Sequence, residues 1–444
     1  MAEKLLSVGL DVGTTSTQLI VSELTVENSA SAFSVPQMQI SRRQIRYQSP
    51  VHFTPLLRQD LVDGGALRRL VAAEYEKAGI RREDVDTGAV IITGETSRKE
   101  NAAAVLENLS DLAGDFVVAT AGPDLESILA AKGAGATDYA EETGKTVLHM
   151  DIGGGTTNLA LIEGGNITAT GCMNVGGRLI KRDPNGAITY LSPVLDGLYD
   201  GAVGQVPTNS QLETLANTLV SALEMAAGLR QPNELLARLW TREAATAWPI
   251  PTQPIVLSFS GGVADCIETA HPDLAFGDIG PILGRAIGKS RLCAGEYRLG
   301  TETIRATVIG AGSHATQLSG STVFYQNIRF PLKNLPVVTA MDQLSRLDGP
   351  GVLALPTPPE ICYRHITALA DAIAAQWPPA QPVLLAPEAD MAKALGHALA
   401  LRLGKETPIL CIDRVQLGEN SYLDVGNPMA HAIPVVVKTL ILNR

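Results

Sequence analysis

Two short stretches decide the fold of this chain: Asp11-Val-Gly-Thr-Thr-Ser-Thr-Gln-Leu19 and Asp151-Ile-Gly-Gly-Gly-Thr-Thr-Asn-Leu159. Aligned at an offset of 140 residues, they share an Asp, a Gly, a Thr and a Leu at matching positions. Each copy follows one apolar run and precedes another. Each is therefore predicted to be a strand–turn–strand hairpin with a Gly/Thr-rich tip. Two copies placed alike in this way predict two related domains.

Strands and helices alternate along the rest of the sequence. Apolar residues at helical spacing predict helices at 66–78, 100–112, 125–132, 212–229, 366–375 and 391–403. Short apolar runs predict further strands at 88–93, 116–120, 255–259, 383–386, 409–412 and 433–442. This alternation favours mixed α/β sheets. With 444 residues, we expect a first lobe at 1–140, a second at 141–305, and a return to the first lobe with a C-terminal α/β region at 306–444.

Composition excludes several classes of protein. The chain has 45% apolar residues, too many for disorder, and carries 46 acidic against 35 basic residues, a net charge of −11. That balance and the lack of a large basic cluster argue against nucleic-acid binding. No apolar run approaches the length of a membrane span, and the N-terminus is unlike a signal peptide. The five scattered cysteines predict reduced, mostly buried thiols in a cytosolic protein.

The hairpin tips have the chemistry of a phosphate site. Glycine lets backbone N–H groups approach an anion closely, and Thr hydroxyls add donors. An Asp at the strand end can bind a hydrated Mg²⁺ that carries the phosphate charge. A third tight turn follows the strand at 255–259. The candidate metal ligands are Asp11 and Asp151, which we expect at exposed turn ends. The candidate nucleotide-binding residues are Gly13, Thr14, Thr15, Thr17, Gly153, Gly154, Gly155, Thr156, Thr157, Gly261 and Gly262.

This order of motifs resembles the actin/heat-shock chaperone/hexokinase ATPase superfamily. Residues 11–17 and 151–158 resemble its two phosphate motifs, and 255–265 its adenosine motif. Residues 121–135 and 308–315 resemble its two connecting helices. The resemblance implies an actin-like ATPase fold, with two related lobes around a nucleotide cleft and hinged at these helices.

Two stretches narrow the resemblance. Ile91-Ile-Thr-Gly-Glu-Thr-Ser-Arg-Lys-Glu-Asn-Ala102 and Ala121-Gly-Pro-Asp-Leu-Glu-Ser127 look like the ethanolamine-utilisation reactivating factors. The resemblance implies a chaperone-like ATPase that uses ATP and Mg²⁺ to exchange damaged cobalamin for intact adenosylcobalamin in ethanolamine ammonia-lyase. Adenosylcobalamin would be involved only indirectly, through that partner enzyme. It also implies a cytoplasmic protein, able to associate with a bacterial microcompartment and to form a homodimer.

One departure from the superfamily concerns the attacking water. Heat-shock chaperones carry a Glu before the Pro of the first connecting helix, where this chain has Gly122 before Pro123. Asp124 follows the Pro and is the candidate to take over this role through a water. The candidate catalytic residues are therefore Asp124, with Asp11 and Asp151 acting through the metal. Asp124 could equally cap its helix. Two further sites stay open. His149 is either close to a bound metal or a buried strand histidine bonded to the backbone, and Arg98 and Lys99 either contact a ligand or form a solvated face.

Three alternative functions remain. A small-molecule kinase of the same superfamily would need a carboxylate base facing a substrate pocket. A filament-forming relative attached to the membrane would favour a basic amphipathic C-terminal helix, whereas the C-terminus here is strand-like. A nucleotide-gated scaffold would bind ATP without consuming it. ATP consumption without a soluble phosphate acceptor separates the chaperone from the kinase.

Overall fold

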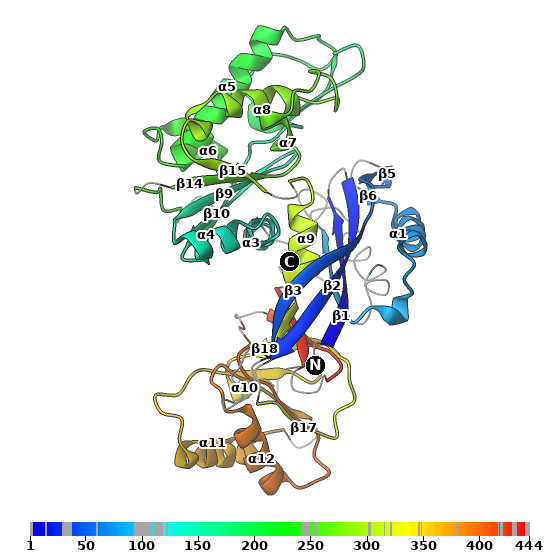
Figure 1. Cartoon of the computed structure of the whole chain (residues 1–444), viewed down its shortest axis with the longest axis vertical. Helices are drawn as coiled ribbons and strands as arrows, with labels where there is room; N and C mark the ends of the chain where they lie inside the picture. The colour runs from blue at the N-terminus through cyan, green and yellow to red at the C-terminus, as the bar shows by residue number, and fades with distance from the viewer. Residues whose placement is uncertain are drawn as a thin grey trace. The chain divides into compact units, whose positions relative to one another are not determined.

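The chain separates into two compact units in a computed structural model: unit 1 comprises Met1–Thr120 with Ala311–Arg444, and unit 2 comprises Ala121–Gly310 (Figure 1). The lobe boundaries expected from the sequence stay predictions. The structure describes residues 3–13, 16–28, 38–58, 61–92, 109, 119–120, 123–241, 248–252, 255–300, 303–314, 316–319, 322–344, 347, 349–378, 381–415, 417, 421–428 and 433–439.

Unit 1 begins with a sheet of order β3-β2-β1-β7-β8 in which β4 also pairs with β2. Adjacent strands among β3, β2 and β1 are antiparallel, and β7 and β8 are parallel to β1. The strands are β1 (Glu3–Val12), β2 (Ser16–Asn28), β3 (Met38–Gln48), β4 (His52–Phe53), β7 (Thr87–Ile92) and β8 (Ala119–Thr120). β5 (Leu56–Arg58) and β6 (Leu61–Val62) form a separate two-stranded ladder.

Helix α1 (Gly64–Ala78) packs on this sheet as its apolar spacing predicts. Leu67, Val71 and Tyr75 recur at four-residue intervals and join the strand residues of one buried cluster. The side chain of Asp63 accepts a hydrogen bond from the Ala66 amide and caps the first turn. The 3₁₀ turn η1 (Arg82–Asp84) then leads to β7. The helix predicted at 100–112 lies outside the described residues, apart from Leu109.

Unit 2 repeats the topology of the first sheet. Its order is β11-β10-β9-β14-β15, in which adjacent strands among β11, β10 and β9 are antiparallel and β14 and β15 are parallel to β9. The strands are β9 (Val147–Ile152), β10 (Thr157–Glu163), β11 (Asn166–Met173), β14 (Val256–Ser260) and β15 (Tyr297–Leu299). β12 (Ile180–Arg182) and β13 (Ile188–Leu191) pair beside this sheet. Two sheets of one strand order give this chain the actin-like ATPase fold.

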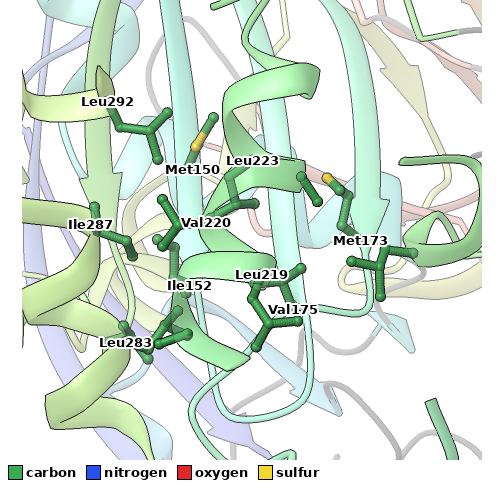
Figure 2. Close-up of a cluster of buried hydrophobic side chains, with 14 of the residues drawn as sticks. Met150, Ile152, Met173, Val175, Leu219, Val220, Leu223, Leu283, Ile287 and Leu292 are labelled. Carbon is green, nitrogen blue, oxygen red and sulfur yellow. The ribbon is translucent and has the colours of Figure 1, made fainter. Parts of the chain in front are cut away.

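Helices cover both faces of the unit 2 sheet (Figure 1). The helices of this unit are α3 (Pro123–Gly133), α4 (Ala136–Thr143), α5 (Asn209–Ala226), α6 (Glu234–Leu239), α7 (Asp265–Glu268) and α8 (Gly280–Gly288), with 3₁₀ turns η3 (Pro193–Leu195) and η4 (Arg291–Cys293). Helix α9 (Ala306–His314) begins in unit 2 and ends in unit 1. Because side chains alternate along β9, Met150 and Ile152 join Leu219 and Leu283 in the large core under α5 and α8 (Figure 2). The opposite face meets α3 and α4 through small alanines.

Helices α3 and α9 touch through their backbones. A Cβ atom added to Gly133 would lie 1.8 Å from the carbonyl oxygen of Ala306, and one added to Gly310 would lie 2.0 Å from that of Leu129. Only glycine fits at these two positions. The chain passes between the units at two places, after residue 120, just before α3, and after residue 310, within α9.

The C-terminal part of unit 1 holds an eight-stranded sheet of order β16-β23-β22-β18-β19-β20-β21-β17. Its strands are β16 (Thr316–Leu318), β17 (Phe324–Gln326), β18 (Leu332–Val338), β19 (Val352–Leu355), β20 (Val383–Pro387), β21 (Ile409–Cys411), β22 (Ser421–Val425) and β23 (Pro434–Thr439). Strands β18 to β21 are parallel and are connected through α10 (Met341–Leu344), α11 (Tyr363–Gln376) and α12 (Ala392–Leu403). Buried apolar clusters form on both faces of this sheet.

Candidate functional site

The two sequence repeats are hairpins with the same hydrogen bonds. In the first tip the amide of Gly13 donates to the carbonyl of Ser16 at 2.8 Å, and in the second the amide of Gly153 donates to Thr156 at 2.9 Å. Strand register agrees as well, because Asp11 pairs with Gln18 and Asp151 with Asn158. Residues that are 140 positions apart therefore make equivalent hydrogen bonds and strand pairs in the two hairpins.

The first tip is tied to the neighbouring strand by threonines. Thr17 is buried, and its hydroxyl lies 3.0 Å from that of Thr54, which donates to the carbonyl of Gly13 at 2.7 Å. Asp11 is half-buried near the end of β1. Thr14 and Thr15 lie outside the described residues. Sequence reasoning missed Thr54, because its contact with the tip spans 41 residues.

The second tip presents three consecutive backbone donors. Within the described ranges, no group accepts a hydrogen bond from the amides of Gly154, Gly155 or Thr156. These residues are partly or fully exposed. Thr157 differs from them, since its buried hydroxyl donates to the carbonyl of Val175 at 2.8 Å. Successive free amides at a turn form a nest for an anion, so the local structure fits a phosphate group.

A segment not singled out from the sequence folds against this tip. The amide of Gly177 donates to the carbonyl of Gly153 at 3.0 Å, and that of Arg178 donates to Gly154 at 2.6 Å. A Cβ atom on Gly176 would lie 2.3 Å from the Gly154 carbonyl oxygen. The signal that could have revealed the segment is its pair of glycines, three residues after the end of β11.

The turn at Gly261-Gly262 meets the end of β9 in the same unit. Gly261 has a φ of +88°, and a Cβ there would lie 2.3 Å from the carbonyl oxygen of Ile152. The amide of Val263 donates to the same carbonyl at 3.1 Å. A Cβ added to Gly262 would meet only the Ile304 side chain, in an ordinary contact at 3.8 Å. The third predicted turn thus lies beside the strand that carries Asp151.

Asp151 is buried rather than at an exposed turn end. Its side chain accepts hydrogen bonds from the hydroxyls of Ser260 on β14 and Thr307 on α9. Burial raises the pKa of Asp151 to about 6, and these two hydrogen bonds oppose that effect. Both partners are neutral, so a bound cation would stabilise the charged form. The expectation of exposure was wrong because α9 covers the strand end.

Behind Asp151 lies a buried histidine. The Nδ1 atom of His149 is 3.0 Å from the Ser258 hydroxyl, and its Nε2 atom is 2.9 Å from that of Ser260. Burial lowers the pKa of His149 to about 3, which keeps the ring neutral. With both ring nitrogens in hydrogen bonds, His149 is a structural residue that orients Ser260 and not a metal reporter. Its partners are serine hydroxyls, whereas a backbone partner was expected.

The structure adds a buried carboxylate on α3. Glu126 accepts a hydrogen bond from the side-chain amide of Asn158 at 3.1 Å, and Asn158 faces Asp151 across the hairpin. Asp124 lies inside the first turn of the same helix and not at the residue before it, and its side chain is outside the described residues. Its water-positioning role stays a prediction. The same holds for Arg98 and Lys99, which are not described.

The donor set fits a magnesium ion that is carried by phosphate. In the part of the chain that the structure describes, no cluster of three or more His, Cys, Asp or Glu residues could hold a metal by itself. Mg²⁺ commonly keeps several waters and binds through one or two carboxylates plus substrate phosphates, so Asp151 beside an anion nest suits it. None of the described helices is long and apolar enough to cross a bilayer.

Comparisons with known proteins agree over nearly the whole chain. The family model "Ethanolamine utilisation protein EutA" matches residues 3–349 and 341–443. Two relatives named "Ethanolamine ammonia-lyase reactivase EutA", from Salmonella typhimurium strain LT2 and Escherichia coli strain K12, are 38% and 37% identical, each over 98% of both chains.

Solved structures are more distant. The ethanolamine utilization protein EutJ from Carboxydothermus hydrogenoformans is 18% identical with a TM-score of 0.33, covering 69% of this chain and 89% of that one. An exopolyphosphatase-like protein is 14% identical with a TM-score of 0.40, covering 70% and 99%. The family model and the full-length relatives establish that this chain belongs to the EutA family of ethanolamine utilisation proteins.

Proposed function

We propose that this protein is an ATP- and Mg²⁺-dependent reactivase of ethanolamine ammonia-lyase, which exchanges damaged cobalamin in that enzyme for intact adenosylcobalamin. The relatives that bear the reactivase name match 98% of this chain, so the proposal concerns the whole protein. Adenosylcobalamin would be bound by the lyase and not by this chain. A homodimer and an association with a microcompartment stay predictions.

The observation that carries the proposal is the second hairpin tip. Three unbonded amides, at Gly154, Gly155 and Thr156, form an anion nest close in sequence to a buried carboxylate, Asp151. A carboxylate beside a polyphosphate repels it unless a cation lies between them. We therefore assign Asp151 to Mg²⁺ and the tip to phosphate. By the same chemistry we assign Asp11 to Mg²⁺ and the tip at 13–17 to phosphate. We assign Gly261 and Gly262 to the adenosine.

Nucleotide can drive reactivation only if it shifts a conformational equilibrium. A ligand shifts such an equilibrium by its difference in affinity for the two states, and moving a balance from 1:99 to 99:1 takes about 5.5 kcal/mol. Phosphate and metal contacts that exist in only one state would supply this difference. One nucleotide state would then bind the lyase tightly and loosen its cobalamin site, and the other would release it.

Nucleotide binding is tested first, on the complete chain. A ligand that binds only the native state stabilises it by about 2.7 kcal/mol at a concentration 100 times its dissociation constant. Saturating Mg·ATP should therefore raise the melting temperature, and ATP with EDTA should raise it less. If no nucleoside triphosphate shifts the melting of the folded protein, the nucleotide assignment is wrong.

Reactivation is tested with lyase that has been inactivated by cyanocobalamin and supplied with excess adenosylcobalamin. Activity should return only with this protein, ATP and Mg²⁺ together, and Asp151→Asn should fail. The matched control is Asp196→Asn, an exposed carboxylate of the same unit, which should reactivate normally. Recovery of lyase activity at an equal rate without nucleotide would contradict the proposal that nucleotide controls the conformational change. No recovery, together with rapid phosphorylation of a small molecule, would favour the kinase.

A further inference from the structure

Arg178 runs along the second hairpin tip. Its amide donates to the carbonyl of Gly154 at 2.6 Å, which fixes its backbone against the turn. Its aliphatic stem covers the same glycine, because a Cβ added to Gly154 would lie 3.1 Å from Cδ and 3.3 Å from Cγ of Arg178. The side chain therefore starts beside the three free amides, and the guanidinium lies at the end of that stem.

A buried acid holds the guanidinium. Oδ2 of Asp278 lies 3.3 Å from Nε of Arg178, and Oδ1 accepts a hydrogen bond from the Gly280 amide at 2.8 Å. The side chain of Asp278 is 8% exposed, whereas that of Arg178 is 29% exposed. Both carboxylate oxygens are thus engaged within the protein. Neither Nη1 nor Nη2 of Arg178 takes part in a hydrogen bond with any described residue.

These contacts leave an oriented pair of donors at the rim of an anion nest. Asp278 engages Nε, so the terminal nitrogens stay available to a ligand, and their planar geometry matches two oxygens of one phosphate group. Fixing the fork before binding reduces the side-chain entropy lost on binding. A lysine at this position would keep the charge but not the two-pronged contact.

We infer that Arg178 is a phosphate-binding residue, which contacts an oxyanion of the nucleotide held by the amides of Gly154 to Thr156. The inference rests on the proposed function, since it takes the ligand to be a nucleoside polyphosphate. It extends that function to a residue that belongs to neither repeat. The competing interpretation is a structural clamp, in which Arg178 only joins Asp278 to the tip.

Three variants separate these interpretations. Arg178→Met keeps an apolar stem over Gly154 and removes the guanidinium. Arg178→Lys keeps the charge and removes the fork. The control is Lys181→Met, which removes a positive charge three residues further on, where Lys181 lies over the ring of Tyr190 at 5.4 Å.

The experiment is isothermal titration of each complete chain with Mg·ATP, Mg·ADP and inorganic pyrophosphate. A hydrogen-bonded charge at the site predicts that Arg178→Met weakens ATP and pyrophosphate binding by about ten- to a hundredfold. Arg178→Lys should lose less, and Lys181→Met should bind within about twofold of the wild type. The structural interpretation instead predicts a lower melting temperature without a selective loss of phosphate ligands.

The outcomes are distinguishable. Wild-type affinity for all three ligands in a folded Arg178→Met protein overturns the inference and leaves the proposed function standing. A wild-type chain that binds none of the three ligands overturns both. If Arg178→Met does not fold, Arg178→Lys decides the question, since unchanged ATP affinity in that variant contradicts a contact that needs the planar fork.

Discussion

Replacing Gly133 by alanine should destabilise unit 2 through the contact between α3 and α9. The added Cβ would lie 1.8 Å from the carbonyl oxygen of Ala306 and 2.7 Å from the amide nitrogen of Gly310. Both neighbours are backbone atoms of another helix, which cannot rotate away as a side chain could. Because nonbonded carbon contacts are favourable only near 3.5 Å, the helices would have to separate by roughly 1.5 Å.

The expected size follows from two opposing effects. Overpacking of this kind typically costs about 1–3 kcal/mol. Alanine gains up to about 1 kcal/mol over glycine inside a helix, but Gly133 is the last residue of α3 and gains less. The net loss should be about 2 kcal/mol. For a unit of this size, that lowers the melting temperature by about 4–8 °C.

Calorimetry of the complete chain measures the effect, with circular dichroism as a second probe. The control is Gly295→Ala in the same unit, where an added Cβ meets no atom within 4 Å. That variant should melt within about 1 °C of the wild type. If Gly133→Ala melts at the wild-type temperature as well, the close approach of the two backbones is not a feature of the folded protein.

Two further predictions concern buried polar groups. Burial raises the pKa of Glu74, but hydrogen bonds to its carboxylate, among them one from Tyr47 at 2.6 Å, hold the pKa below its usual range overall. The ionised carboxylate therefore stabilises the fold fully above about pH 5, and this stabilisation is lost as the pH falls through the folded-state pKa. Glu74→Gln should lower stability at pH 7 by about 1–3 kcal/mol and flatten this acid dependence, as urea unfolding at several pH values will measure. His149→Leu should cost about 1–3 kcal/mol by leaving the hydroxyl of Ser258 without its ring partner. Adding Ser258→Ala should recover part of that loss, and a double variant that is no more stable than His149→Leu would contradict the account.

Local patterns predicted the elements that depend on nearby residues. The apolar spacing of 66–78 gave α1, and that of 212–229 gave α5 with an end three residues earlier. The repeat at an offset of 140 predicted both hairpins, and the structure reproduces even their turn hydrogen bonds. These features need only the local alternation of side chains and the conformational freedom of glycine.

Contacts between distant segments could not be predicted in this way. Thr54 reaches Gly13 across 41 residues, and Asp278 reaches Arg178 across 100. Nothing in the local sequence of either partner encodes these pairs. The burial of Asp151 depends likewise on Thr307, in a helix that follows more than 150 residues later. A single sequence therefore predicts candidate site residues, but it does not predict which distant groups contact them in the fold.

The duplicated hairpin also explains why its two copies differ. At the offset of 140, Thr14 in the first copy corresponds to Gly154 in the second. A side chain at 154 would press against the stem of Arg178, and the carbonyl of the same residue lies where only a glycine at 176 can approach. In the second copy the segment from Gly176 to Arg178 packs across the tip, so a side chain at 154 would be crowded and one at 176 would clash with backbone. Each copy thus serves as an internal reference for the other. Positions that the two copies share are those that the turn itself requires, and positions that differ reflect contacts with the segment that packs on only one of them.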